Sequence, residues 1–249
     1  MKVAFLLHGQ IRLLHEVFDD IKEKILDTYT PDVYCQVWWD EDVEKNGYES
    51  INKKYYPPEN AIEELKKTYN PKKLRIDKNY KKINEDGNEW SSEIYVDYPK
   101  LLSYKMNPSV VDYFGQFLSI QNVSNLFNWE GYDFIVKWRY DFKPINFPKL
   151  ENLNKNKFYV QSDLHNTLSN KNDEFIDTCF ILPNDMKNYL DIFNHLNDDA
   201  SNEDGRQSIS PNRGCSPESV YSHYLNRLNY LDRLVKLPYG EFTTIKITK

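Results

Sequence analysis

The chain has 249 residues, enough to bury a substantial hydrophobic core, and a single domain over residues 1–249 is the expected organisation. Its formal net charge of −6 argues against a protein built mainly to neutralise nucleic-acid phosphates, because that function draws on concentrated lysine and arginine. Hydrophobic residues make up 40% and charged residues 28%, a balance typical of a globular protein with a well-solvated exterior.

The first predicted element is a strand over 3–7. Val3 to Leu7 is continuously apolar and Gly9 follows, which is typical of a buried parallel strand that ends in a tight turn. The segment is too short for a signal sequence, and no other run approaches the ~20 apolar residues of a membrane span. We therefore expect a soluble protein without a transmembrane segment, in the cytoplasm of a bacterium or of a virus-infected host cell.

Apolar residues at helical spacing from Leu13 to Leu26 predict a helix that covers this strand. The β-forming residues over 32–39 predict a second strand, and the order strand, helix, strand favours a parallel pair. The next stretch predicts a loop over 46–58, a short amphipathic helix over 59–69 and a third strand over 72–76.

The second half of the chain continues this alternation. A helix is expected over 110–127, and it leads into an apolar strand over 134–138. Further elements are expected as strands over 158–161 and 175–182, a helix over 185–196, and a last helix from Pro217 to Leu228. The pattern predicts an α/β fold with a mostly parallel central sheet flanked by helices.

The three cysteines, Cys35, Cys179 and Cys215, lie far apart in the sequence and lack the close spacing of a zinc site or a redox motif. We expect free thiols, as in a reducing compartment. Cys35 and Cys179 lie within apolar strands and are expected to act as small core residues.

The first candidate site follows the first strand and consists of His8, Gly9, Gln10 and Arg12. Ligands of parallel α/β sheets bind beyond the carboxyl ends of strands, and a glycine there lets the backbone approach a phosphate or a base. Arg12 adds a guanidinium fork for a diphosphate. A plain turn with solvated polar residues explains the segment equally well, because neither a dinucleotide fingerprint nor a P-loop is present.

The second candidate site is Arg139-Tyr140-Asp141, directly after the strand over 134–138. A carboxylate at this position can hold a divalent cation that bridges the two phosphates of a sugar nucleotide. Alternation along a strand places Arg139 and Asp141 on the same side, so Arg139 can contact a phosphate or orient the carboxylate. A structural arginine–aspartate pair that caps the strand is the alternative.

Three segments resemble a group of bacterial and large-virus glycosyltransferases of the GT-A class: Gly9-Gln10-x-Arg12, the strand from Asp32 to Trp38, and the run from Tyr132 to Asp141. The resemblance spans most of the chain. It implies a GT-A-like, Rossmann-related fold, with a nucleotide-binding part over about 1–145 and an acceptor-side part over about 146–249. It also implies transfer of a hexosyl or pentosyl unit from a nucleoside-diphosphate sugar to a glycan or glycoprotein acceptor.

The resemblance further implies a cofactor, Mn²⁺ or Mg²⁺, held by Asp141. The GT-A class carries an Asp-x-Asp-type motif, and this chain has Arg139 where that motif has its first carboxylate. One carboxylate with waters and phosphate oxygens can still hold the cation, which we expect here. An arginine-rich site that offsets the diphosphate charge without a metal stays open.

Two acidic residues late in the chain match further short elements of the same family. Asp177 precedes the strand residues of 178–182, and Glu218 follows Pro217 at the start of the last helix. If transfer inverts the anomeric centre, one carboxylate must deprotonate the acceptor hydroxyl. Asp177 is the first choice for this base and Glu218 the second, because an acid in the first turn of a helix is also favoured electrostatically.

Two other functions fit the same residues. A non-catalytic nucleotide- or carbohydrate-binding module of the same fold would account for the missing first carboxylate. A nucleotidyltransferase would also require metal and phosphate groups, and release of pyrophosphate from a nucleoside triphosphate would distinguish it.

Overall fold

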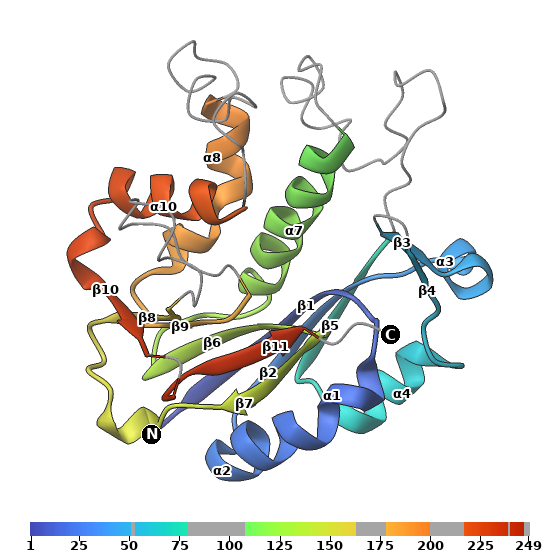
Figure 1. Ribbon diagram of the computed structural model, residues 1–249, viewed down its shortest axis with the longest axis horizontal. Helices are drawn as coiled ribbons and strands as arrows, with labels where there is room; N and C mark the ends of the chain where they lie inside the picture. Colours follow the sequence, from blue (N-terminus) through green and yellow to red (C-terminus); the bar gives the residue numbers. More distant parts are fainter. Residues whose placement is uncertain (51–52, 79–107, 163–177, 200–216, 239, 247–249) are drawn as a thin grey trace.

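The computed structural model describes residues 1–50, 53–78, 108–162, 178–199, 217–238 and 240–246. Seven strands form the central sheet: β1 (Val3–Gln10), β2 (Asp32–Trp38), β5 (Lys73–Asp77), β6 (Phe134–Arg139), β8 (Phe158–Gln161), β9 (Phe180–Leu182) and β10 (Leu234–Leu237). Their order across the sheet is β10-β8-β9-β6-β1-β2-β5. The protein is thus a mixed α/β fold with a central sheet between helices (Figure 1).

Most neighbouring strands in this sheet run parallel. β1 pairs in parallel with β2 and with β6, β2 with β5, and β8 with β10. β9 runs antiparallel to both of its neighbours, β6 and β8. The predicted mostly parallel central sheet is confirmed, with β9 as the reversed strand.

Helices cover both faces of the sheet (Figure 1). One face carries α7 (Pro108–Ser124), η3 (Lys187–Leu190), α8 (Ile192–Asp199) and α10 (Pro217–Arg227). The other face carries α1 (Leu14–Ile21), η1 (Lys22–Leu26), α2 (Asp27–Tyr29) and α4 (Ala61–Tyr69). Shorter helical elements are α3 (Glu41–Asn46), η2 (Leu150–Asn152) and η5 (Leu231–Arg233).

Alternation along the strands divides the buried apolar residues into two cores. Ala4 and Leu6 of β1 belong to the core on the α7 face, whereas Phe5 and Leu7 belong to the core on the α1 face. Successive side chains of a strand point to opposite sides, so one continuously apolar strand supplies both cores. This explains why β1 contains no polar residue before His8.

The path of the chain produces a reversal of strand order beside β1. From β1 the chain proceeds through α1 to β2 and then to β5, away from one side of β1. The next described helix is α7, and it is followed by β6 on the opposite side of β1. Open α/β sheets bind ligands at such a switch point, outside the carboxyl ends of the strands.

Two small sheets accompany the large one. β7 (Phe142–Asn146) pairs in antiparallel fashion with β11 (Thr243–Lys246), and β3 (Tyr48–Ser50) pairs with β4 (Lys53–Tyr55). The loop predicted over 46–58 is therefore wrong in part, because it contains this hairpin.

Gly47 explains how the chain enters the hairpin. Its φ is +74°, and a Cβ atom at this position would lie 2.5 Å from the backbone oxygen of Tyr55. A residue with a side chain would both strain the backbone and clash with β4. The glycine therefore permits the close pairing of β3 and β4, which the polar composition of 46–58 does not predict.

The later elements differ from their predicted bounds. The strand expected over 175–182 is described only as β9, and residues 175–177 lie outside the described part of the chain. The helix expected over 185–196 is divided into η3 and α8 at Asp191. The Asp191 carboxylate accepts a hydrogen bond from the Asn194 side-chain amide at 3.0 Å, which links the residue at the break to the first turn of α8.

Two further expectations concern membrane-spanning helices and the state of the cysteines. Among the described residues, no helix is long and apolar enough to cross a membrane. Cys35 and Cys179 are buried free thiols, as predicted, and burial raises the pKa of each to about 12. Cys215 lies outside the described residues.

Candidate functional site

Polar side chains gather where four parallel strands end. β1, β2, β5 and β6 are parallel neighbours, so their carboxyl ends meet at one edge of the sheet. His8 of β1 lies in register with Gln36 of β2 and with Arg139 of β6, and Gln36 lies in register with Arg75 of β5. The side chains at these positions therefore occupy the same level on one face of the sheet.

Arg12, Asp141 and Arg139 form a cluster at the switch point. Arg139 binds Asp141 in bidentate fashion, with Nε 3.0 Å from Oδ1 and Nη2 2.9 Å from Oδ2. Arg12 approaches the same carboxylate, with Nη2 3.8 Å from Oδ2. The side chains are 12%, 5% and 18% exposed for Arg12, Asp141 and Arg139, so the Arg12–Asp141–Arg139 cluster is largely desolvated.

Neighbouring elements orient both guanidinium groups. Nη1 of Arg139 donates to Oε1 of Gln116 in α7 at 3.2 Å, and the guanidinium carbon lies 5.1 Å from the Phe142 ring centre. The guanidinium carbon of Arg12 lies 5.0 Å from the ring centre of Tyr55 in β4. Planar guanidinium groups are favoured over aromatic faces, so α7 and the β3–β4 hairpin position the two arginines.

The backbone between the end of β1 and the start of α1 is unusual. Gly9 has a φ of +108°, and Leu13 has a φ of +60° in the left-handed region. The left-handed conformation of a non-glycine residue costs roughly 1–3 kcal/mol, which contacts with the surrounding structure must offset. The backbone N–H of Ile11 donates to the Tyr48 hydroxyl at 3.2 Å, and that hydroxyl donates to the Trp38 carbonyl at 2.6 Å. Tyr48 thus fixes the turn that carries Arg12.

His8 is buried beside the cluster, with 2% of its surface exposed. Its Nδ1 lies 2.7 Å from Oγ of Ser119, and the Ser119 hydroxyl donates its proton to the Gln116 carbonyl at 2.8 Å. Nδ1 of His8 and the Ser119 hydroxyl therefore share one hydrogen bond, whose direction follows from the tautomer of the ring. Nε2 of His8 is buried and has no hydrogen-bond partner among the described residues.

The charge state of His8 follows from its surroundings. Its pKa is lowered well below the usual value, first by burial and then by the positive charges of Lys137 and Arg139. Lys137 is fully buried in β6, where its Nζ donates to the Thr178 carbonyl at 3.1 Å and lies 4.5 Å from the Phe180 ring centre. His8 is consequently uncharged at neutral pH.

A second polar network lies next to the first and centres on Asp77 at the end of β5. Its Oδ2 accepts hydrogen bonds from Gln36 and from Asn122 of α7, each at 2.9 Å, and Nε of Arg75 lies 2.8 Å from Oδ1. Oε1 of Gln36 in turn accepts the backbone N–H of Gly9 at 3.3 Å. The network joins α7, β5, β2 and the end of β1.

The residues of the two networks divide into predicted and unpredicted ones. The sequence predictions placed His8, Gly9, Arg12, Arg139 and Asp141 at strand ends, and all five lie at this edge of the sheet. They missed Gln36, Asp77, Lys137, Gln116, Ser119 and Asn122. Asp77 carries the same signal as Asp141, a carboxylate at the end of a strand, and could have been found by it.

The remaining predicted site residues are Gln10, Glu218 and Asp177. The backbone carbonyl of Gln10 accepts the N–H of Arg12 at 2.8 Å, and its side chain is half-buried. Glu218 is the second residue of α10, which begins at Pro217 as predicted. Asp177 lies outside the described residues. The roles of Asp177 and Glu218 therefore stay predictions.

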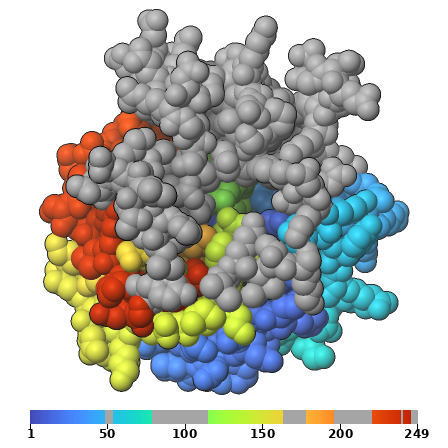
Figure 2. Space-filling model, viewed as in Figure 1, coloured from blue at the N-terminus to red at the C-terminus, as the bar shows by residue number. Residues whose placement is uncertain are grey.

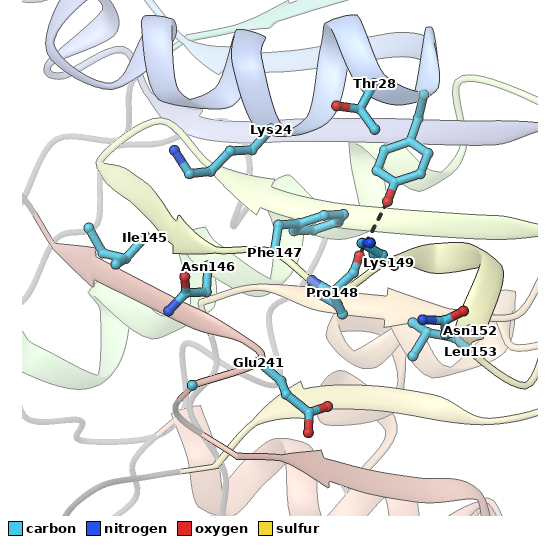
Figure 3. A pocket seen from close by; sticks show the side chains of 12 residues that line it. Lys24, Thr28, Ile145, Asn146, Phe147, Pro148, Lys149, Asn152, Leu153 and Glu241 are labelled. Atoms are coloured by element: carbon cyan, nitrogen blue, oxygen red, sulfur yellow. Dashed lines mark hydrogen bonds between the residues drawn. The ribbon is translucent and has the colours of Figure 1, made fainter.

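A cavity of about 550 Å³ lies away from this edge, between the end of α1–α2 and the segments after β7 and before β11 (Figure 3). Lys24 and Thr28 lie on one side of Phe147, and Asn146 and Glu241 lie on the other (Figure 3). Figure 2 shows residues of the amino-terminal helices beside those of β7 and of the carboxyl-terminal part at the lower edge of this face. Tyr29 of the cavity precedes β2, so the cavity lies toward the amino-terminal ends of the strands and contains none of the predicted site residues.

The carboxylate chemistry of the cluster does not fit a divalent cation. Both oxygens of Asp141 already accept from Arg139, and a second guanidinium lies 3.8 Å from Oδ2. Within the described part of the chain, no group of three or more histidine, cysteine, aspartate or glutamate side chains is arranged to hold a metal ion. Mg²⁺ and Mn²⁺ prefer several oxygen ligands, and Asp141 is one carboxylate shared with two cations.

Comparison with known proteins gives likenesses of structure only. No protein-family profile matches the sequence, and no curated protein does. Among solved structures, the glycosyltransferase GlyE of Streptococcus pneumoniae TIGR4 is similar, with 9% identity and a TM-score of 0.44, and its apo form has 10% identity and a TM-score of 0.45. Xyloside xylosyltransferase 1 of mouse, in its apo form, has 8% identity and a TM-score of 0.45.

The extent of these likenesses differs between the two proteins. They cover 95% and 96% of this chain for the two GlyE structures, and 96% for the mouse enzyme. The chain spans 45% and 46% of the length of the GlyE chains, less than half, and 85% of the mouse chain. With TM-scores below 0.5, the likenesses do not by themselves assign a function to this chain.

Proposed function

We propose that the protein is a glycosyltransferase that moves a sugar from a nucleoside-diphosphate sugar to a glycan acceptor. The observation that carries this proposal is the Arg12–Asp141–Arg139 cluster at the switch point of a mostly parallel sheet. Ligands bind at this place in open α/β sheets, and paired guanidinium groups suit a diphosphate. The sequence resemblance to GT-A glycosyltransferases is independent of the side-chain geometry and supports the same activity.

The proposed reaction replaces one bond at the anomeric carbon of the donor sugar. An acceptor hydroxyl oxygen forms a bond to this carbon, while the bond from the carbon to the diphosphate oxygen breaks. The leaving nucleoside diphosphate takes the electron pair, and a base takes the proton of the acceptor hydroxyl. Preorganised positive groups aimed at the leaving oxygen lower the barrier, because they stabilise negative charge as it develops.

Each residue of the cluster has a distinct part in this proposal. Arg12 and Arg139 bind the diphosphate, and Asp141 holds the two guanidinium groups in place. Gly9 lets the turn after β1 come close to the nucleotide, since it adopts a φ of +108° and has no side chain. Asp177, or else Glu218, accepts the proton of the acceptor hydroxyl.

Thermal unfolding with a panel of nucleotides tests the proposal. UDP, GDP and their sugar derivatives are added with and without Mn²⁺, because a ligand that binds only the native state raises the apparent stability. The expected gain is ~2.7 kcal/mol at a concentration of about 100 times the Kd. Arg139→Ala is expected to reduce affinity for the responding nucleotide by about 10- to 100-fold, since hydrogen bonds to charged groups are lost.

Arg233→Ala is the matched control. Arg233 also binds a carboxylate in bidentate fashion, with Nη1 and Nη2 at 3.0 and 2.8 Å from Asp185, but it precedes the edge strand β10. This variant is expected to keep nucleotide affinity. The proposal fails if the folded wild-type protein responds to none of the nucleotides, or if both variants lose affinity equally.

A nucleotide-binding module without turnover is the second candidate. The carboxylate of Asp141 is occupied by two guanidinium groups, which favours binding over metal-assisted chemistry. Release of UDP or GDP from the bound sugar nucleotide, measured over hours with a panel of acceptor glycans, separates the two functions. Binding without any release would support the module.

A further inference from the structure

The family resemblance implies a divalent cation at Asp141, and the geometry of this residue conflicts with that role. A cation would have to share the carboxylate with the bidentate fork of Arg139 and with Arg12 at 3.8 Å. Like charges at such distances repel strongly where water is excluded, and the Asp141 side chain is only 5% exposed. Asp141 is better suited to hold guanidinium groups than to hold a metal.

The arginines are held by their neighbours independently of any ligand. Gln116 and Phe142 hold the guanidinium of Arg139, and Tyr55 holds that of Arg12. Each guanidinium presents five N–H donors in one plane, more than a single carboxylate can accept. Two guanidinium groups and one carboxylate meet in this cluster, at the carboxyl ends of the parallel strands where a diphosphate would lie.

We propose that Arg12 and Arg139, organised by Asp141, bind the diphosphate of the donor directly, so that donor binding requires no divalent cation. This inference rests on the proposed function and makes it more specific. Asp141 is a positioning residue in this scheme, because it acts through the two arginines. The fixed guanidinium groups of the cluster supply the positive charge that a metal ion would otherwise supply.

The test measures nucleoside diphosphate binding to the full chain by calorimetry, with UDP and GDP as probes. One series contains EDTA and the other contains Mn²⁺. We expect the Kd of the responding nucleotide to agree within about threefold between the series, a difference of less than the factor of ten that 1.4 kcal/mol represents. We also expect affinity to fall as salt is added, because partly exposed ionic contacts are screened.

Two substitutions separate the role of charge from the role of geometry. Arg139→Lys keeps the positive charge and loses the bidentate fork, and it is expected to weaken binding about tenfold. Asp141→Asn releases both guanidinium groups from their common carboxylate, and it is expected to weaken binding about tenfold while leaving it equally strong in EDTA and in Mn²⁺. Arg233→Lys is the matched control and should bind as the wild type does.

The possible outcomes distinguish the inference from the function on which it rests. Binding that occurs only with Mn²⁺ and is abolished in Asp141→Asn would overturn the inference and leave the proposed function standing. Binding that is unaffected by Arg12→Ala and Arg139→Ala would also overturn it, because the diphosphate would then lie elsewhere. If neither series binds UDP or GDP while urea unfolding shows a folded protein, the proposed function itself fails.

Discussion

The two faces of the central sheet differ in chemistry at the ends of β1 and β6. On the α1 face, Leu7 and Trp138 are 0% exposed and belong to an apolar core. On the α7 face, the next residues along the same strands are His8 and Arg139, and Lys137 is also completely buried. Burial of polar groups is unfavourable unless they are hydrogen-bonded, so the α7 face is organised for something besides stability.

The helices on the two faces match this difference. α1 presents Leu14, Val17 and Ile21 to the sheet. α7 contributes Gln116, Ser119 and Asn122, spaced by three residues, and each contacts a polar side chain at the strand ends. Residues three apart lie on the same side of a helix, so α7 carries a polar stripe where α1 carries an apolar one. The contrast shows that, at these strand ends, one face of the sheet is lined by apolar side chains and the other by hydrogen-bonded polar ones.

The largest expected effect is on the apolar face. Trp138→Ala removes a fully buried indole that lies 6.2 Å from the Phe5 ring and 6.3 Å from the Phe242 ring, between centres. We expect the free energy of unfolding in urea to fall by ~3–5 kcal/mol, because the cavity cannot be refilled.

Lys137→Met is the comparison on the polar face, since it replaces a buried amine with an apolar chain of similar length. We expect a change below ~1.5 kcal/mol. Equal losses for Lys137→Met and Trp138→Ala would contradict the distinction between the two faces.

The next effect concerns the turn that carries Arg12. Tyr48→Phe removes the hydroxyl that joins the N–H of Ile11 to the carbonyl of Trp38. We expect a loss of ~1–3 kcal/mol in urea unfolding, because buried backbone groups lose their partner. Nucleotide affinity should fall as well, since the turn is no longer fixed. Tyr56→Phe is the control, because Tyr56 is 64% exposed, and it should leave both measurements unchanged.

The smallest expected effect is a pH dependence of the folding stability that arises from His8. His8 has a lowered pKa in the folded protein, first through burial, so it stays neutral where the unfolded chain binds a proton. Above the unfolded pKa of about 6.5 the residue contributes nothing to the pH dependence of stability. As pH falls through that value, the unfolded state gains a proton that the native state lacks, and stability falls by up to ~1.4 kcal/mol per pH unit.

Urea unfolding of wild type and His8→Gln between pH 7 and pH 5 measures this contribution. The difference in stability between the two proteins should shift in favour of His8→Gln as pH falls. A constant difference across the range would show that His8 binds its proton as readily in the folded protein as in the unfolded chain, and it would contradict the lowered pKa.

Much of the fold could be predicted from the sequence, because the elements that form the switch point are strongly patterned. The apolar runs of β1, β2 and β6 and the periodicity of α1 and α7 predicted their own structures. Their parallel order then brought Arg12, Arg139 and Asp141 to one edge, and the contacts of Asp141 with both arginines agree with that expectation.

The rest of the site depends on information that no local pattern contains. Gln36 and Asn122 meet at Asp77 only because β2, β5 and α7 adopt one particular register and crossing. A polar residue within a helix is ordinarily read as solvent-exposed, so the buried stripe of α7 gave no signal. The β3–β4 hairpin was missed for a related reason, since its pairing depends on the contact of Gly47 with Tyr55.

Asp141 lies where the chain passes from the large sheet into the small one. Phe142 begins β7 directly after it, accepts the indole N–H of Trp138 at 2.9 Å through its carbonyl, and lies in register with Lys246 of β11. A chain that ends before Thr243 would still contain every residue of the Arg12–Asp141–Arg139 cluster. It would nevertheless lack the strand that fixes the residue after Asp141, so a truncated or fused version of the protein must keep β11 to keep its arginines in place.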